Sequence, residues 1–110
     1  MRRLILAIAA LFLSAGPVHA EEIWACDGFV YVDGSQSEPF ILSGEEKKLA
    51  YYLYGFEHVL KYVSEDILKT KLFVNESMNL PHFIREDGVQ LEIQRIDWYS
   101  RGTANCYEQR

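Results

Sequence analysis

The chain has 110 residues, of which 49% are hydrophobic and 25% are charged, and its formal net charge at pH 7 is −5. This length predicts a single small domain. The excess of acidic residues argues against nucleic acid or an anionic membrane as a partner, because both reward a basic surface.

Residues 1–20 have the layout of a secretory signal peptide. Two arginines precede an apolar run from Leu4 to Leu13, and the small residues Val18 and Ala20 come three and one positions before the expected cut. The run is too short for a membrane-spanning helix, which needs about 20 residues. A buried apolar helix is the alternative interpretation of this segment.

Cleavage after Ala20 predicts a secreted or periplasmic domain of residues 21–110 without stable membrane insertion. The cut removes Arg2 and Arg3 from the 11 basic residues, so nine basic residues face 16 acidic ones and the net charge becomes −7. Such acidity favours solubility.

The two cysteines, Cys26 and Cys106, lie near the two ends of the mature domain. In an oxidising compartment we expect them to form a disulfide. Redox chemistry or metal binding is the alternative, but the sequence has neither a Cys-x-x-Cys pair nor a cysteine–histidine cluster. A structural bridge is therefore the favoured interpretation.

The first part of the domain is typical of β-strands. Residues 22–33 are rich in β-branched and aromatic side chains, with a bulge expected near Asp27-Gly28 and a turn at Asp33-Gly34. Residues 39–42 predict a further short strand.

Residues 43–69 predict a long amphipathic helix. Ser43 and Glu46 fit a capping box. A strand is the alternative over the first residues, but beyond Gly55 a period of two would place Lys61 on one face with Val59 and Val63. We expect the helix to bend at Gly55 or at residues 64–66. At helical spacing, six apolar residues would form its contribution to the core: Leu49, Leu53, Phe56, Leu60, Val63 and Ile67.

The second half predicts short strands around an irregular connection. Residues 71–74 and 89–94 have strand patterns, and a final strand would bring Cys106 beside Cys26. A helix beginning at Asp87 is the alternative for residues 88–101. We therefore expect an α+β fold, with one long helix packed on a small antiparallel sheet, and an all-α disulfide-bonded domain as the alternative.

Catalytic and metal-binding motifs are absent from the sequence. The mature domain has two histidines, His58 and His82, and neither lies in a known metal-ligand spacing. No phosphate-binding loop or nucleophile motif is present. We therefore predict a non-enzymatic protein without a cofactor, catalytic residue or metal site. A small hydrolase or a metal-binding protein is the alternative.

The polar face of the expected helix is unusually aromatic. Tyr54, His58 and Tyr62 would follow one line along it, with Tyr51 beside them and Gly55 forming a dent. Tyrosine is enriched at protein interfaces. We predict that this face binds another protein, in an inhibitor, immunity-type or stress-chaperone role. A face covered within the domain and a homodimer are the alternatives.

Two families resemble parts of the chain. Residues Trp24, Cys26, Phe29, Val32, Asp33 and Ser35 resemble the start of the mature HdeA-type periplasmic acid chaperones. That resemblance implies a helical fold and acid-stress chaperone activity.

The second resemblance is to the small periplasmic inhibitors of C-type lysozyme, which join an early Cys-Asp-Gly to a cysteine near the C-terminus. Cys26-Asp27-Gly28 and Cys106 match that pattern. It implies a β-barrel and inhibition of a lysozyme.

Overall fold

The computed structural model describes residues 21–98 and 100–109. The expected signal peptide, residues 1–20, lies outside the described residues. Every regular element in the described part is a β-strand. The expected α+β fold and its all-α alternative are therefore both wrong. The bounds are β2 Glu22–Cys26, β3 Val30–Tyr31, β4 Phe40–Glu45, β5 Lys48–Leu53, β6 Phe56–Glu65, β7 Lys71–Asn75, β8 Pro81–Asp87, β9 Gln90–Ile96 and β10 Arg101–Glu108.

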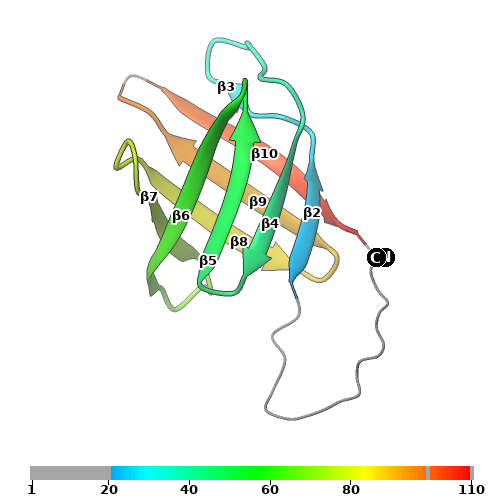
Figure 1. The fold of residues 1–110 in the computed structure, drawn as a ribbon, viewed down its shortest axis with the longest axis vertical. Coiled ribbons are helices and arrows are strands. Elements are labelled where there is room, and N and C mark those ends of the chain that lie inside the picture. Colours follow the sequence, from blue (N-terminus) through cyan, green and yellow to red (C-terminus); the bar gives the residue numbers. More distant parts are fainter. Residues whose placement is uncertain (1–20, 99, 110) are drawn as a thin grey trace.

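The strands form a closed antiparallel barrel (Figure 1). The order is β2-β4-β5-β6-β7-β8-β9-β10, and β10 returns to pair with β2, which removes both sheet edges. The two-residue strand β3 pairs with the other half of β10. Strands β2 and β3 thus lie along one neighbour, separated by residues 27–29.

Residues 43–69 form strands where a helix was expected. They contain the end of β4, all of β5 and β6, and a two-residue turn at Tyr54-Gly55. Both turn residues have positive φ, 52° and 82°. That is the backbone of a type I′ turn, whose twist matches a β-hairpin. Gly55 therefore reverses the chain and does not form a dent in a helix.

The sequence showed a helical pattern because the core-facing positions switch from odd to even residue numbers across that turn. Odd-numbered residues of β5 face the core, whereas even-numbered residues of β6 do so. Val59, Lys61 and Val63 share the outward face of β6. This mixture of apolar and charged residues on one face had been the argument against a strand, but it is acceptable on a face exposed to solvent. Of the six predicted core residues, Leu49, Leu53 and Leu60 are buried. The other three are exposed: Phe56, Val63 and Ile67.

The second half agrees better with the sequence. Strands β7, β9 and β10 confirm the predicted strands, and the helical alternative for residues 88–101 is wrong. Residues 81–87 were predicted to be irregular but form β8. Pro81 is the first residue of that strand, a position where the missing N–H is tolerated.

The predicted disulfide is present. Cys26 and Cys106 are register partners on β2 and β10, and both are buried in the core beside Trp24, Leu91 and Ala104. The bridge therefore fastens the seam where the barrel closes. No helix in the described residues is long and apolar enough to cross a membrane.

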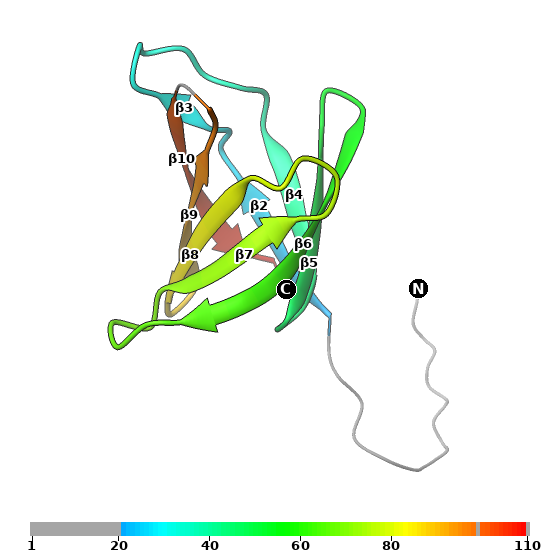
Figure 2. The same ribbon diagram turned by 90° about the vertical axis from the view of Figure 1, so that its left-hand side faces the viewer.

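The two ends of the barrel have different connections (Figure 2). Because the strands alternate in direction, the connections at 27–39, 54–55, 76–80 and 97–100 lie at one end, which we call the open end. The opposite end has the connections 46–47, 66–70 and 88–89 and the two ends of the described chain. Figure 2 shows the β5–β6 hairpin and the connection between β2 and β4 both at the open end, with the connection reaching farther.

Candidate functional site

Exposed apolar side chains occur on every connection of the open end. Tyr54 and Phe56 are 62% and 72% exposed at the tip of the β5–β6 hairpin. The other three connections carry Val32, Met78 and Trp98. Exposed apolar groups concentrated in one place often mark an interaction site.

A pocket of about 580 Å³ opens at this end, between the β5–β6 hairpin and the β7–β8 connection. Its size lies in the range of small-molecule sites, and the mouth of a barrel is a common place for such a site. The lining residues are Leu53, Tyr54, Phe56, Glu57, His58, Ser77, Met78 and Arg95.

The hairpin tip beside the pocket is held by the connection between β2 and β4. The backbone N–H of Tyr54 donates to a carboxylate oxygen of Glu38 at 2.5 Å, and the Glu38 N–H donates to the Tyr54 hydroxyl at 3.1 Å. Phe56 lies next to this anchored turn and faces the pocket. The apolar rim is therefore positioned by side-chain contacts.

Below the pocket lies a chain of buried hydrogen bonds. Arg95 Nη1 donates to the Tyr51 hydroxyl at 3.2 Å, and that hydroxyl lies 2.8 Å from His82 Nε2. His82 Nδ1 lies 2.9 Å from the carbonyl oxygen of Leu80, which can only accept. His82 therefore carries its proton on Nδ1 and accepts the Tyr51 proton at Nε2. The other side of Arg95 is fixed by Nε, which donates to Asp97 at 2.7 Å.

A second hydrogen-bond chain fixes His58 in the opposite tautomer. The Leu80 N–H donates to Asn75 Oδ1 at 2.6 Å, so the Asn75 Nδ2 group is the donor that faces His58 Nδ1 at 3.2 Å. Nδ1 of His58 therefore accepts, and in the neutral ring the proton sits on Nε2. The His58 ring also stacks on Tyr51, with centroids 4.8 Å apart.

Burial keeps these groups uncharged. It lowers the pKa of His82 to about 4 and raises the pKa of Tyr51 to about 12. Burial also lowers the pKa of His58, with the nearby Arg95 cation acting in the same direction. Near neutral pH both rings are neutral, and Arg95 carries the only charge in the network apart from its partner Asp97.

Several hydrogen-bond donors in this network have no partner among the described residues. Arg95 is 8% exposed, and only two of its five N–H groups, one on Nε and one on Nη1, have acceptors in the described part of the chain. His58 is 5% exposed, and its Nε2–H has no acceptor there. Both residues line the pocket. A buried donor without an acceptor is costly, so its acceptor has to come from the pocket.

The predicted partner-binding residues separate into three environments. Tyr51 and His58 are buried and stacked inside the barrel. Tyr54 and Gly55 form the exposed hairpin tip. Tyr62 lies apart from them, edge-on to Phe73 at 5.7 Å. The helix that was to align these residues is absent, so the predicted continuous aromatic face is wrong.

Sequence reasoning missed Arg95 and Asn75 as site residues. Arg95 occupies an inward position of β9, in alternation with Leu91 and Ile93. A charged residue within an otherwise apolar alternation is the signal that could have identified it.

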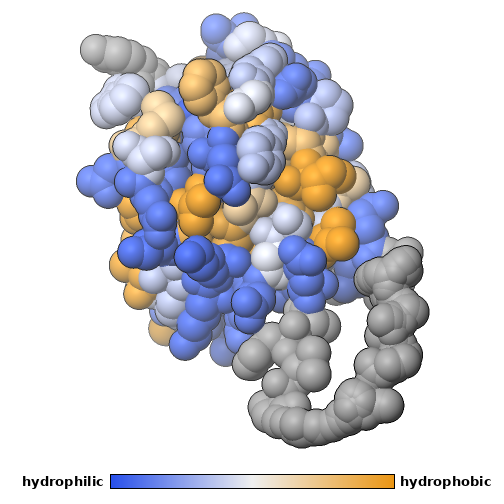
Figure 3. All heavy atoms as spheres, viewed as in Figure 1, coloured by the Kyte–Doolittle hydropathy of each residue, from blue (hydrophilic) through white to orange (hydrophobic). Residues whose placement is uncertain are grey.

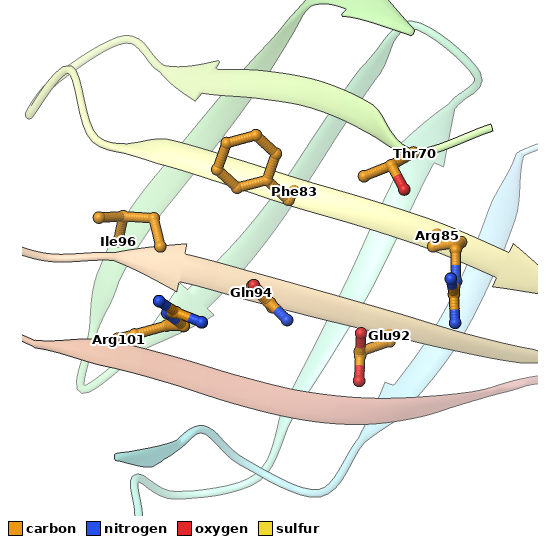
Figure 4. Close-up of a pocket in the computed structure, with 7 residues that line it drawn as sticks. All are labelled: Thr70, Phe83, Arg85, Glu92, Gln94, Ile96 and Arg101. Carbon is orange, nitrogen blue, oxygen red and sulfur yellow. The ribbon is translucent and has the colours of Figure 1, made fainter. Parts of the chain in front are cut away.

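A second hollow of about 430 Å³ lies on the outer wall (Figure 4). Figure 4 shows side chains from β8, β9 and β10 along this face, with Phe83 and Gln94 between Arg85 and Arg101. All its lining residues are at least partly exposed, so solvent can satisfy their polar groups. It is therefore a weaker candidate than the pocket at the open end. Its lining residues are Thr70, Phe83, Arg85, Glu92, Gln94, Ile96 and Arg101.

The outer face over β4–β6 carries apolar groups scattered among hydrophilic ones (Figure 3). Ile41, Tyr52 and Val63 are more than half exposed on these strands. Scattered exposed apolar residues are ordinary on protein surfaces. Within residues 21–98 and 100–109, no cluster of three or more His, Cys, Asp or Glu side chains is arranged to hold a metal ion.

The chain matches no known protein-family model, no curated protein and no solved structure at a level that indicates relationship. The two family resemblances therefore rest on the residues named for them. The helical fold implied by the acid chaperones is not observed. The β-barrel implied by the lysozyme inhibitors is the observed architecture.

Proposed function

We propose that this chain is an exported, non-enzymatic protein that binds and inhibits another exported protein through the open end of its barrel. The observation that carries the proposal is the β5–β6 hairpin at the open end, with Tyr54 and Phe56 exposed at its tip. A protruding aromatic hairpin can enter a groove of a partner, and aromatic residues dominate binding energy at such contacts.

The charge of the domain narrows the choice of partner. The mature domain has nine basic and 16 acidic residues. At the open end, Asp33, Glu38 and Glu57 lie on the same connections and hairpin as the apolar residues. An acidic surface around an apolar centre favours a basic partner and speeds its association. The Cys26–Cys106 disulfide is compatible with an oxidising, extracytoplasmic location.

The resemblance to inhibitors of C-type lysozyme supplies the first partner to test. The early Cys-Asp-Gly, the late cysteine and the barrel all agree with that resemblance. The Ser-Gly-x-x-Tyr loop of those inhibitors is not matched, because Ser43-Gly44 is followed by Glu45-Glu46-Lys47. These residues lie in β4 and in the β4–β5 turn at the opposite end. The hairpin tip would therefore replace that loop as the contact.

The test is inhibition of bacterial cell-wall lysis by a C-type lysozyme, using purified residues 21–110. We expect dose-dependent inhibition by the natural sequence. Phe56→Ser combined with Trp98→Ser should weaken inhibition at least tenfold, since two exposed anchors of the open end are lost. The matched control is Ile67→Ser combined with Leu68→Ser, which removes exposed apolar residues at the opposite end and should leave inhibition unchanged.

Two results would contradict the proposal. One is equal loss of inhibition in both double variants, which would remove the role of the open end. The other is a stable homodimer that buries the β5–β6 hairpin at all concentrations, seen by light scattering, because the tip would then be occupied by a second copy.

A further inference from the structure

We propose that the pocket at the open end binds a small amphipathic carboxylic acid, with its carboxylate on Arg95 and His58 and its apolar tail against Leu53, Phe56 and Met78. This inference is independent of the inhibitor function, because a protein partner can bind the hairpin tip whether or not the pocket is filled.

Arg95 and His58 form the floor of the pocket and present hydrogen-bond donors to it, with no free acceptor. Three N–H groups of Arg95 and the His58 Nε2–H lack acceptors among the described residues, and both residues are more than nine-tenths buried. His58 cannot accept there, because its Nδ1 is already engaged with Asn75. The matching ligand group is therefore one that only accepts hydrogen bonds, and a carboxylate meets that condition with two oxygens.

Arg95 can take a second carboxylate although it already holds Asp97. Asp97 accepts from Nε, which leaves both N–H groups of Nη2 and one of Nη1 available. A guanidinium presents its donors as a planar fork that suits a carboxylate. The Tyr51 contact fixes the direction in which Nη1 points, and Asp97 fixes the Nε edge. The remaining donors are therefore held in place before a ligand arrives, which lowers the cost of binding.

Most of the pocket wall is apolar and the pocket is of limited size, with the exposed Glu57 and Ser77 as polar residues of the wall. Leu53 is buried beside its register partner Phe56, and Met78 lines the pocket from the β7–β8 connection. A volume of about 580 Å³ suits a small ligand with an aromatic or short alkyl tail. Most of the barrel interior below is filled by side chains, which excludes a long tail.

The probe for this proposal is 3-phenylpropionate, titrated into residues 21–110 at neutral pH and followed by calorimetry and amide NMR shifts. Two comparison compounds separate the parts of the ligand. 3-Phenylpropionamide keeps the tail and removes the charge, and acetate keeps the charge and removes the tail. We expect saturable one-site binding of the acid, at least tenfold weaker binding of the amide, and no saturation with acetate.

Two variants test the location of the site. Arg95→Lys keeps a charge but loses the fork, and we expect at least tenfold weaker binding. Met78→Glu adds a second carboxylate to the pocket wall, beside the exposed Glu57, at a partly exposed position that the fold can accommodate, and should also weaken binding at least tenfold. The matched control is Leu68→Glu, the same change of charge at an exposed position of the opposite end, which should not alter binding.

The proposal is overturned if the acid does not saturate, if the acid and the amide bind equally, or if Met78→Glu and Leu68→Glu bind the acid alike. If Arg95→Lys fails to fold, the Met78→Glu comparison still decides the question. Inhibition of a lysozyme without acid binding would remove this inference and leave the proposed function in place.

Discussion

The two ends of the barrel both expose apolar side chains, but only the open end joins them to buried hydrogen-bond donors. Ile67 at the opposite end is 95% exposed, more than any apolar residue of the open end. The polar groups near the opposite end include Lys71, which lies 3.8 Å from Glu46 and 3.9 Å from Glu86. Those charges have partners, whereas three of the five N–H groups of Arg95 and the Nε2–H of His58 have none among the described residues.

This difference shows that exposure alone is a poor guide to a site. An exposed apolar loop tip can be tolerated, because water covers it at modest cost. A buried donor without an acceptor is costly to the folded state and is therefore the more informative observation. The open end is the candidate site because it has buried donors without acceptors, and its exposed apolar residues support this choice.

The largest expected effect is on stability, and it comes from the disulfide that closes the barrel between its two ends. Replacing Cys26 and Cys106 together by Ala removes a cross-link with a sequence separation of 80 residues. On the chain-entropy account this lowers the free energy of unfolding by about 4.5 kcal/mol. Urea unfolding followed by fluorescence measures the change. Selective loss of one end, seen as amide hydrogen exchange that rises only there, would contradict a common closing role for the bridge.

The second prediction is a loss of stability in acid that originates at the open end. The unfolded chain protonates His82 below its ordinary pKa of 6.5, whereas the folded protein does so only below about 4. Stability should therefore fall as the pH drops through this window, by roughly 3 kcal/mol, and His82 should add no further loss below it.

Urea unfolding at several pH values within this window measures the loss. The control is His82→Gln, which keeps a polar side chain but cannot titrate. Arg95, His58 and Tyr51 face His82, and His58 contributes a smaller loss of the same sign that remains in the control. An identical pH dependence in both proteins would show that His82 is not held neutral by the fold.

The third prediction compares two tyrosines. Tyr51→Phe leaves His82 Nε2 without a donor and Arg95 Nη1 without its acceptor, and should lower the free energy of unfolding by about 1–3 kcal/mol. Tyr62 is a partly buried residue outside this network, and Tyr62→Phe should change the free energy of unfolding by less than about 0.5 kcal/mol. Denaturant unfolding of both variants measures the difference. Equal effects would mean that the buried network adds nothing particular to the open end.

The smallest expected effect tests whether the turns of the two ends are alike. Gly55 and Gly88 have φ of 82° and 69°, and at both glycines the space that a Cβ would occupy has no neighbouring group within 4 Å. Substitution of either by Ala should cost about 1 kcal/mol from backbone strain alone. Thermal unfolding of the two variants checks this. A much larger loss for Gly55→Ala would indicate that the hairpin tip has a structural role beyond its turn.

The sequence predicted the parts of the fold that local patterns determine. Alternation in residues 89–94 indicated β9, and the two cysteines indicated that the last strand lies beside the first. The stretch 43–69 failed because apolar residues of two adjacent strands, read across a two-residue turn, mimic the helical period. Tyr54 at positive φ was not anticipated, since Gly55 alone was read as a surface feature. Which alternate residues of a strand face the core depends on the strands that pair with it, and this pairing is not visible in the local sequence.

The candidate site was predicted only in fragments. Tyr51, Tyr54 and His58 were singled out as aromatic and polar residues on one helical face, but the barrel places two of them inside and one at the rim. Arg95, His82 and Asn75 come from three other strands. Long-range strand pairing brings them together, and no local pattern in the sequence records it.

The most direct test of the buried donor at the open end is the position of the ring protons on the two histidines of the domain. Residues 21–110 contain only His58 and His82, so long-range nitrogen–proton NMR at neutral pH reads both rings without ambiguity. We expect opposite neutral tautomers, with the proton on Nε2 in His58 and on Nδ1 in His82. The same tautomer in both rings, or a charged His58, would contradict a pocket floor that presents a fixed donor at the open end.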